Sequence, residues 1–368
     1  MNTFGNKIKV TVFGESHASA IGVTVDGLPA GTPVNEAYIQ SLLDLRAPGK
    51  SDTTTRRKEP DKAEFLSGVK DGYTCGGSVA AIIRNTDTRS GDYASLEGKP
   101  RPSHADYSAF CKYHGYEDYR GGGHFSGRIT AALVAAGGIV LPALEELGIK
   151  IGTHILQCAG VNDRDFEDIE KDVETLKNGV FPTLEEKSGA EMTEKILAAR
   201  AENDSVGGIT QTAICGLPAG MGEPWFDTFE GILSHALFSL GGVKGVDFGL
   251  GFGFAAKRAS ECNDAFRIEN GKTVSETNNN GGINGGITNG MPVVFRCAVK
   301  PTPSIAKEQK TVDFIKGENA DITIHGRHDP AIVRRICPVI DSVAALAAAD
   351  MLAQRYGTDF FLTEDVKR

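Results

Sequence analysis

The sequence predicts an α+β fold in which antiparallel sheets from two related halves pack together. Segments with strand-like alternation occur in groups and helical segments occur in groups, unlike the strict alternation of a parallel βαβ core. The pentapeptide GLPAG at residues 27–31 occurs again 189 residues later, at residues 216–220. The chain also has 45 glycines, which indicates many tight turns and close backbone approaches.

The repeat extends beyond GLPAG. Residues 74–85 (TCGGSVAAIIRN) resemble residues 284–297 (NGGITNGMPVVFRC), and the Ala-rich helix after Arg128 resembles residues 341–355. Chance alone rarely produces three similarities in the same order.

We therefore expect one domain, residues 1–368, built from two halves at about 1–150 and 205–356. Residues from about 161 to 203 are acidic and helix-prone and have no partner in the first half. They are expected to form an inserted helical pair on the surface.

Each element follows from periodicity and from turn residues. The first helix opens with Thr32-Pro33 and Asn35 and closes before Pro48-Gly49, which are ordinary start and stop signals. Helical spacing predicts helices at residues 35–46, 129–147, 229–240 and 341–355. Alternating or β-branched residues predict strands at 7–13, 22–27, 63–69, 78–84, 149–158, 209–215, 246–257 and 292–300.

Charge and composition exclude several classes of function. A net charge of −9 argues against general nucleic-acid binding, because a phosphate backbone needs a broad basic face. The N-terminus lacks the apolar core of a signal peptide, and the most apolar run, residues 129–144, is too short to span a bilayer. Seven cysteines without a C-x-x-C pair indicate neither a disulfide framework nor a zinc site. We expect a cytoplasmic protein that binds no nucleic acid and no membrane.

Two stretches suggest an anion site and acid–base chemistry. In YRGGGHFSGR, residues 119–128, three glycines between two arginines allow backbone amides to close on an anion. In RPSHAD, a proline-restricted turn holds Arg101, His104 and Asp106 near one another, and a histidine beside a carboxylate can transfer protons near neutral pH. A flexible or solvated loop is the competing interpretation of each stretch.

Two further stretches carry histidines. FGESHAS places Ser16 and His17 directly after a strand, where a polar turn is the ordinary alternative. HGRHDP contains His325, His328 and Asp329, which are residue types that bind metal ions. Zinc usually takes three or four ligands and no cysteine lies nearby in the sequence, so we expect no metal.

Taken in order, these motifs resemble the chorismate synthase family. The resemblance spans nearly the whole chain through FGESH, GLPAG, LSGV, RPSHADY, YRGGG, DSVGG, GLPAGMGEP, VKGVDFGLGF, NNNGGINGGITNG, KPTPSI and GRHDP. It implies a β-α-β sandwich, internally duplicated, with antiparallel sheets and surrounding helices, and a homotetramer. It also implies a lyase that eliminates phosphate from 5-enolpyruvylshikimate 3-phosphate in an anti-1,4 sense to give chorismate, with reduced FMN and no net redox change.

The resemblance implies four catalytic residues. His17 would protonate or hold the leaving phosphate, with Ser16 as a hydrogen-bonding relay. His104 would stabilise the reduced flavin at its N1 edge, and Asp329 would assist proton removal near the flavin N5.

The resemblance also implies binding residues. Arg46, Arg128 and Arg327 would bind the phosphate and carboxylates of the substrate as fork-shaped donors. Cofactor contacts are expected at His124, Phe125, Ser126, Gly241, Gly242, Gly285, Lys300, Pro301, Thr302, Pro303, Ser304 and Arg327.

The chain departs from the family pattern at several positions. His124 and Phe125 stand where Arg-Ser is usual, so binding of the FMN phosphate could depend on pH more than in relatives. Ala18 replaces a glycine, and Ala47 and Asp52 replace arginines. Asp52 leaves open whether the chain reduces its own FMN with NADPH.

Two other functions stay open at this point. An FMN-dependent NAD(P)H oxidoreductase would share the flavin but would not need His17, His104 and Asp329. A non-catalytic phosphoanion-binding protein would bind the phosphorylated ring without turnover.

Overall fold

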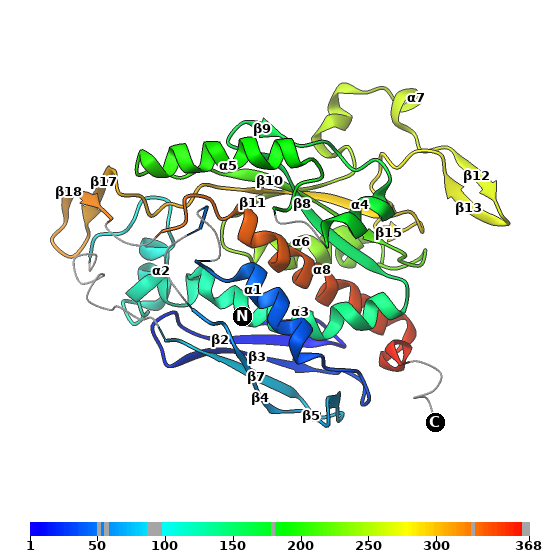
Figure 1. Cartoon of the computed structure of the whole chain (residues 1–368), viewed down its shortest axis with the longest axis horizontal. Helices are drawn as coiled ribbons and strands as arrows, with labels where there is room; N and C mark the ends of the chain where they lie inside the picture. Colours follow the sequence, from blue (N-terminus) through cyan, green and yellow to red (C-terminus); the bar gives the residue numbers. More distant parts are fainter. Residues whose placement is uncertain (50–52, 55–58, 87–97, 178–180, 325–327, 363–368) are drawn as a thin grey trace.

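The computed structural model describes residues 1–49, 53–54, 59–86, 98–177, 181–324 and 328–362. A layer of helices lies between two five-stranded sheets, and further helices cover the outer side of one sheet (Figure 1). All strand pairs in the described chain are antiparallel. The predicted α+β class with antiparallel sheets is confirmed, and the layer of helices agrees with the β-α-β sandwich that the resemblance implies. The expectation that the two sheets pack directly together is wrong, because helices lie between them.

The two sheets share one strand order. The first sheet runs β1 (Thr3–Phe4), β2 (Lys9–Gly14), β3 (Ala20–Asp26), β7 (Val79–Arg84) and β4 (Ala63–Ser67). The second runs β11 (Val243–Phe248), β16 (Val293–Val299), β10 (Gly208–Cys215), β8 (Lys150–Cys158) and β9 (Val161–Asn162). Without the short edge strands β1 and β9, the orders are β2-β3-β7-β4 and β8-β10-β16-β11. A GLPAG segment follows β3 and β10, so the order supports the predicted duplication.

Four helices form the layer between the sheets: α1 (Glu36–Arg46), α3 (Thr130–Glu146), α6 (Phe229–Phe238) and α8 (Val333–Tyr356). The α3 and α8 helices pack against each other through small residues. A Cβ placed on Gly137 would lie 2.3 Å from Cβ of Ser342, so this close approach requires a glycine.

Residues 127–146 and the α8 helix are long and apolar enough to cross a membrane, but 67% and 94% of their apolar windows are buried inside the fold. The expectation that the first run is too short to span a bilayer is therefore wrong, because the helical run has 20 residues. Burial between the sheets, rather than length, identifies both as core helices.

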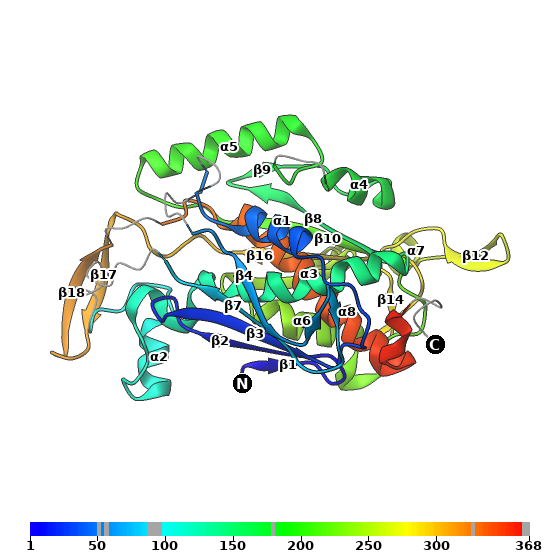
Figure 2. The ribbon, with the colours of Figure 1, turned by 60° about the horizontal axis from the view of Figure 1, so that its bottom comes forward.

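Two helices of the central insertion, α4 (Ile169–Leu176) and α5 (Glu186–Ala201), lie on the outer side of the second sheet (Figure 2). A buried polar cluster holds the insertion there. Nδ1 of His154 lies 3.1 Å from Oδ2 of Asp163, and the same carboxylate accepts the backbone N–H groups of Leu184 and Glu185. Nε2 of His154 lies 2.9 Å from Oε1 of Gln211.

The predicted elements are present with shifted ends, and two of them differ most from the prediction. The strand predicted at 246–257 ends at Phe248, because Gly249 and Gly251 take positive φ and turn the chain into a 3-10 helix, η5 (Gly251–Ala256). The last helix begins at Val333 rather than at residue 341. Pro338 lies inside it, beyond the first turn, so the helix lacks one backbone N–H donor there.

Smaller elements decorate this frame, and the hairpins β17–β18 and β12–β13 project from opposite ends (Figures 1 and 2). Their bounds are β5 (Val69–Lys70), β6 (Tyr73–Thr74), α2 (Asp106–Tyr113), η2 (Arg120–Phe125), η3 (Gly127–Ile129), η4 (Trp225–Asp227), α7 (Ala259–Cys262), β12 (Phe266–Glu269), β13 (Lys272–Ser275), β14 (Ile283–Asn284), β15 (Ile287–Thr288), β17 (Glu308–Asp313), β18 (Glu318–Thr323) and η6 (Thr358–Phe361).

Candidate active site

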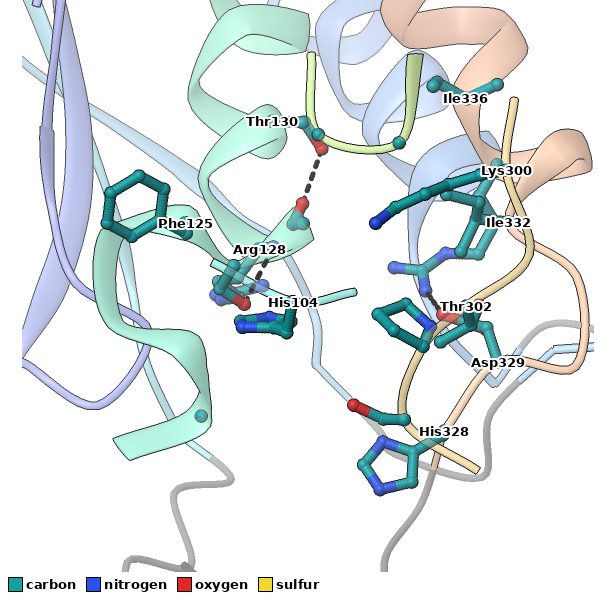
Figure 3. A pocket seen from close by; sticks show the side chains of 18 of the residues that line it. His104, Phe125, Arg128, Thr130, Lys300, Thr302, His328, Asp329, Ile332 and Ile336 are labelled. Atoms are coloured by element: carbon teal, nitrogen blue, oxygen red, sulfur yellow. Dashed lines mark hydrogen bonds and ion pairs between the residues drawn. The ribbon is translucent and has the colours of Figure 1, made fainter. Parts of the chain in front are cut away.

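A cavity of about 370 Å³ is lined by residues of both halves. The first half contributes the end of α1, the start of α3 and chain between them. The second half contributes chain after α6 and the first turns of α8. Figure 3 shows His104 and Phe125 on one side of this cavity, with Lys300, Asp329 and Ile332 facing them. The volume lies in the range of small-molecule sites.

The RPSHAD stretch forms a hydrogen-bonded set at the cavity wall. Oδ1 of Asp106 lies 2.5 Å from Nδ1 of His104 and 2.7 Å from NH2 of Arg101. Burial alone would raise the pKa of Asp106, but the hydrogen bonds from Arg101 and His104 outweigh it and hold that pKa far below its usual range. Asp106 therefore stays ionised, and the predicted proximity of these three residues is confirmed.

Asp329 and His328 enter the cavity from the segment before α8. Asp329 forms an ion pair with NH1 of Arg335, whose Nε donates to the carbonyl of Arg46. Burial and, to a smaller extent, the charge of Arg101 lower the pKa of His328 to about 4, so this imidazole is neutral at pH 7. Within the part of the chain that is described, Nε2 of His328 has no hydrogen-bond partner.

Arg46 and Arg128 line the cavity but are nearly buried, at 3% and 4% exposure. Asp61 binds both guanidinium groups, with Oδ2 2.6 Å from NH1 of Arg46. Nε of Arg46 donates to Thr130, and Nε of Arg128 donates to Asn85. Burial lowers the pKa of Arg46 to about 10, so it remains charged at pH 7. Their binding of substrate stays a prediction, since Asp61 already neutralises part of this charge.

The KPTPS run lines the opposite wall. Nζ of Lys300 donates to the carbonyl of Ser103, and burial lowers the pKa of Lys300. Oγ1 of Thr302 is buried and has no partner among the described residues. Of the predicted cofactor contacts, the cavity wall includes Phe125, Ser126, Gly241, Gly242, Lys300, Pro301, Thr302, Pro303 and Ser304.

Ser16 and His17 lie behind the glycine wall rather than in the cavity lining. Oγ of Ser16 is 2.9 Å from Nδ1 of His17. A Cβ on Gly121, a cavity residue, would lie 2.4 Å from that Oγ, so the glycine lets the loop contact both side chains. Gly121 also has φ +62, which favours glycine.

Other predicted site residues lie elsewhere. The exposed His124 ring contacts the rings of Tyr113 and Phe125. Gly285 forms the β14–β15 turn, and its neighbour Gly286 accepts from the first residue of α6, whereas Gly241 follows the other end of that helix. Arg327, Asp52 and His325 fall outside the described residues. No cluster of three or more possible metal ligands occurs among the residues described.

Comparison with known proteins decides the family. The family model described as chorismate synthase matches residues 8–353. The chain belongs to the chorismate synthase family. The chorismate synthase of Methanosarcina mazei is 45% identical over 349 residues, covering 95% of both chains. That of Lachnoclostridium phytofermentans is 45% identical over 353 residues, again covering 95% of both.

A solved structure supports the same assignment. The "Crystal Structure of Chorismate Synthase" has a TM-score of 0.76 and 28% identity, covering 96% of this chain and 94% of its own. The predictions of family, fold and reaction are thus confirmed. The protein is a chorismate synthase, a lyase of the shikimate pathway in aromatic amino acid biosynthesis, and this family generally depends on reduced FMN.

Sequence reasoning missed the partners of the predicted residues. Asp61 joins Arg46 to Arg128, and Glu59 lies 3.8 Å from the latter. Arg335 pairs with Asp329 across the start of α8. A weak signal existed, because Glu59 and Asp61 follow a basic run that needs counter-charges.

Proposed function

We propose that the cavity between the halves holds reduced FMN and 5-enolpyruvylshikimate 3-phosphate together, and that elimination occurs there. One observation carries this proposal. His104 and Asp329, predicted from separate motifs 225 residues apart, line the same cavity with Lys300 and four arginines. An acidic protein concentrates positive charge at this place, as a substrate with a phosphate and two carboxylates requires.

The residues present fit a flavin. Oγ1 of Thr302 and Nε2 of His328 are buried polar atoms without described partners, and a ligand with polar groups would satisfy them. A Cβ on Gly127 would meet nothing within 4 Å, so this wall is open. Ile332 and Ile336 supply an apolar face suited to a flat ring.

Each cavity residue then has a defined task. Reduced FMN, when bound, supplies electron density to the elimination and recovers it, so no net redox change results. His104 holds a proton at the flavin edge. Asp329, held by Arg335, assists removal of the substrate proton. Lys300 attracts an anion, because its described contact is a neutral carbonyl rather than a carboxylate.

His17 and Ser16 would act on the leaving phosphate. Since both lie behind Gly121, this role requires the phosphate to lie at the glycine wall. Arg46, Arg128 and Arg327 complete the proposed anion binding.

We further propose a cytoplasmic homotetramer. Light scattering coupled to size exclusion tests the assembly, and a mass of one chain or two would contradict it. Reduction of FMN by NADPH stays open and is measured in the assay below.

The decisive experiment is an anaerobic assay with photoreduced FMN and the phosphorylated substrate. Phosphate release and chorismate absorbance should rise together, without consumption of a nucleotide. The assay is repeated aerobically with NADPH. Turnover only with net NADPH oxidation would indicate an oxidoreductase, and substrate binding without phosphate release would indicate a binding protein. Either result contradicts the proposal.

A further inference from the structure

The position of the ring proton on His104 can be deduced from its contacts. Nδ1 lies 2.5 Å from Oδ1 of Asp106, and two acceptor atoms cannot approach so closely without a shared hydrogen. NH2 of Arg101 is also 3.1 Å from Nδ1, but it lies closer to Oδ1 of Asp106, at 2.7 Å, and donates there. Nδ1 of His104 therefore carries the hydrogen, which leaves Nε2 for a ligand.

Asp106 is itself held rigidly. Its carboxylate accepts the backbone N–H of Arg101 at 2.9 Å and the Nε–H at 2.8 Å, besides the two contacts above. It is also the first residue of α2, so its backbone is fixed by a helix. NH1 of Arg101 reaches Ser304 of the second half at 3.4 Å. The carboxylate thus has one orientation, and the imidazole follows it.

The charges around His104 make this carboxylate important. From its own turn it faces Arg101, and Lys300 contacts the preceding residue, Ser103. His328 and Asp329 face it from the segment before α8. Among the described residues, Asp106 is the carboxylate within hydrogen-bond distance of the ring, so it is the group that fixes the ring hydrogen.

We propose that Asp106 is a positioning residue for the elimination: it keeps the hydrogen on Nδ1 of His104 and directs Nε2 to the ligand. The inference deepens the function proposed above and rests on the assigned role of His104.

Asp106→Asn tests this inference in the full-length enzyme under the anaerobic assay. We expect kcat to fall roughly 10- to 100-fold, the scale of carboxylates that orient a functional histidine. KM for the phosphorylated substrate should change by less than about threefold.

A second readout does not depend on activity. In protein with ¹⁵N-labelled histidine, the neutral ring of His104 should show a protonated Nδ1 and an unprotonated Nε2. In Asp106→Asn this preference should weaken, because the amide can donate as well as accept. Comparison with His104→Ala assigns the signals.

Two variants serve as controls. Asp106→Glu keeps the carboxylate and should recover most of the wild-type kcat. Asp247→Asn breaks a similar fork with Arg296, at 2.9 and 2.6 Å, on the second sheet, and should leave kcat unchanged. Thermal melting checks the fold of each.

The outcomes separate this inference from the proposed function. A wild-type kcat in a folded Asp106→Asn, or wild-type His104 with its hydrogen on Nε2, overturns the role of Asp106 alone. Absence of phosphate release by the wild-type enzyme overturns the proposed function instead.

Discussion

The two sheets have the same strand order, yet their first connections differ. Between β2 and β3 the chain makes a short turn that carries Ser16 and His17. Between the equivalent strands β8 and β10 it makes the long insertion with α4 and α5. One connection contributes predicted catalytic groups, and the other covers a sheet.

A single pair of equivalent positions shows the consequence. Phe13 pairs with Gly22 across β2 and β3, and by the GLPAG spacing these correspond to His154 and Gln211. Phe13 is 42% exposed, whereas His154 is fully buried under the insertion. Similar backbones thus hold a surface aromatic in one half and a buried polar network in the other. Connections, rather than strands, decide what each position does.

The largest expected effect belongs to the first half. His104→Ala removes the proton-holding ring and should lower kcat by roughly 10²- to 10⁴-fold in the anaerobic assay. His235→Ala, an exposed histidine on α6 in the second half, should keep wild-type turnover and is the matched control. Wild-type speed in a folded His104→Ala would show that the assignment of His104 is wrong.

A substitution in the second half should lower the stability of the fold rather than the turnover. His154→Ala removes the ring contacts to the buried Asp163 carboxylate and to Oε1 of Gln211. We expect a loss of about 3 kcal/mol in the free energy of unfolding, measured with urea. At a temperature where the variant is folded, kcat should be unchanged. A large loss of kcat with normal stability would contradict this assignment of catalysis to the first-half residue and stability to the second-half residue.

The same cluster should respond to acid. Burial raises the pKa of Asp163, but the hydrogen bonds from His154 and Leu184 outweigh it and place that pKa below the usual value. A depressed carboxyl pKa stabilises the fold above the unfolded value of about 4 and loses this contribution as the pH falls. The destabilisation caused by Asp163→Asn should therefore shrink between about pH 5 and pH 3. A constant difference across this range would contradict the account.

The smallest effect is expected at the exposed equivalent position. Phe13→Ala should cost about 0.5 kcal/mol in urea unfolding, as is usual for partly exposed side chains. Some loss remains because the Phe13 ring packs over Gly22. A cost equal to that of His154→Ala would show that burial does not explain the difference.

The helices, strands and motifs could be predicted from residues close together in the sequence. Asn35 caps α1 as expected, with its side chain accepting from the N–H of Tyr38, because a cap involves residues three apart. The turn that joins Arg101, His104 and Asp106 was likewise predictable, since one proline-restricted loop holds all three. Interactions between residues a few positions apart can therefore be predicted from the local sequence.

Longer-range partners were not predictable in this way. Asp61 lies 67 residues from Arg128, and Arg335 reaches the carbonyl of Arg46 from the other half. Gly285, expected at the cofactor, lies at the opposite end of α6 from Gly241. Such pairings depend on how helices pack between sheets, which no local pattern encodes.

The sequence by itself determined the family, the periodic elements, the repeat and the motifs that carry the imidazoles and carboxylates. Only the tertiary structure decided that Asp61 forms ion pairs with both Arg46 and Arg128. It also decided that α3 and α8 are buried core helices and that Ser16 and His17 lie behind Gly121. The physical reason is that burial and charge pairing arise from surfaces brought together by folding. Periodicity and local hydrogen bonding need only neighbours along the chain.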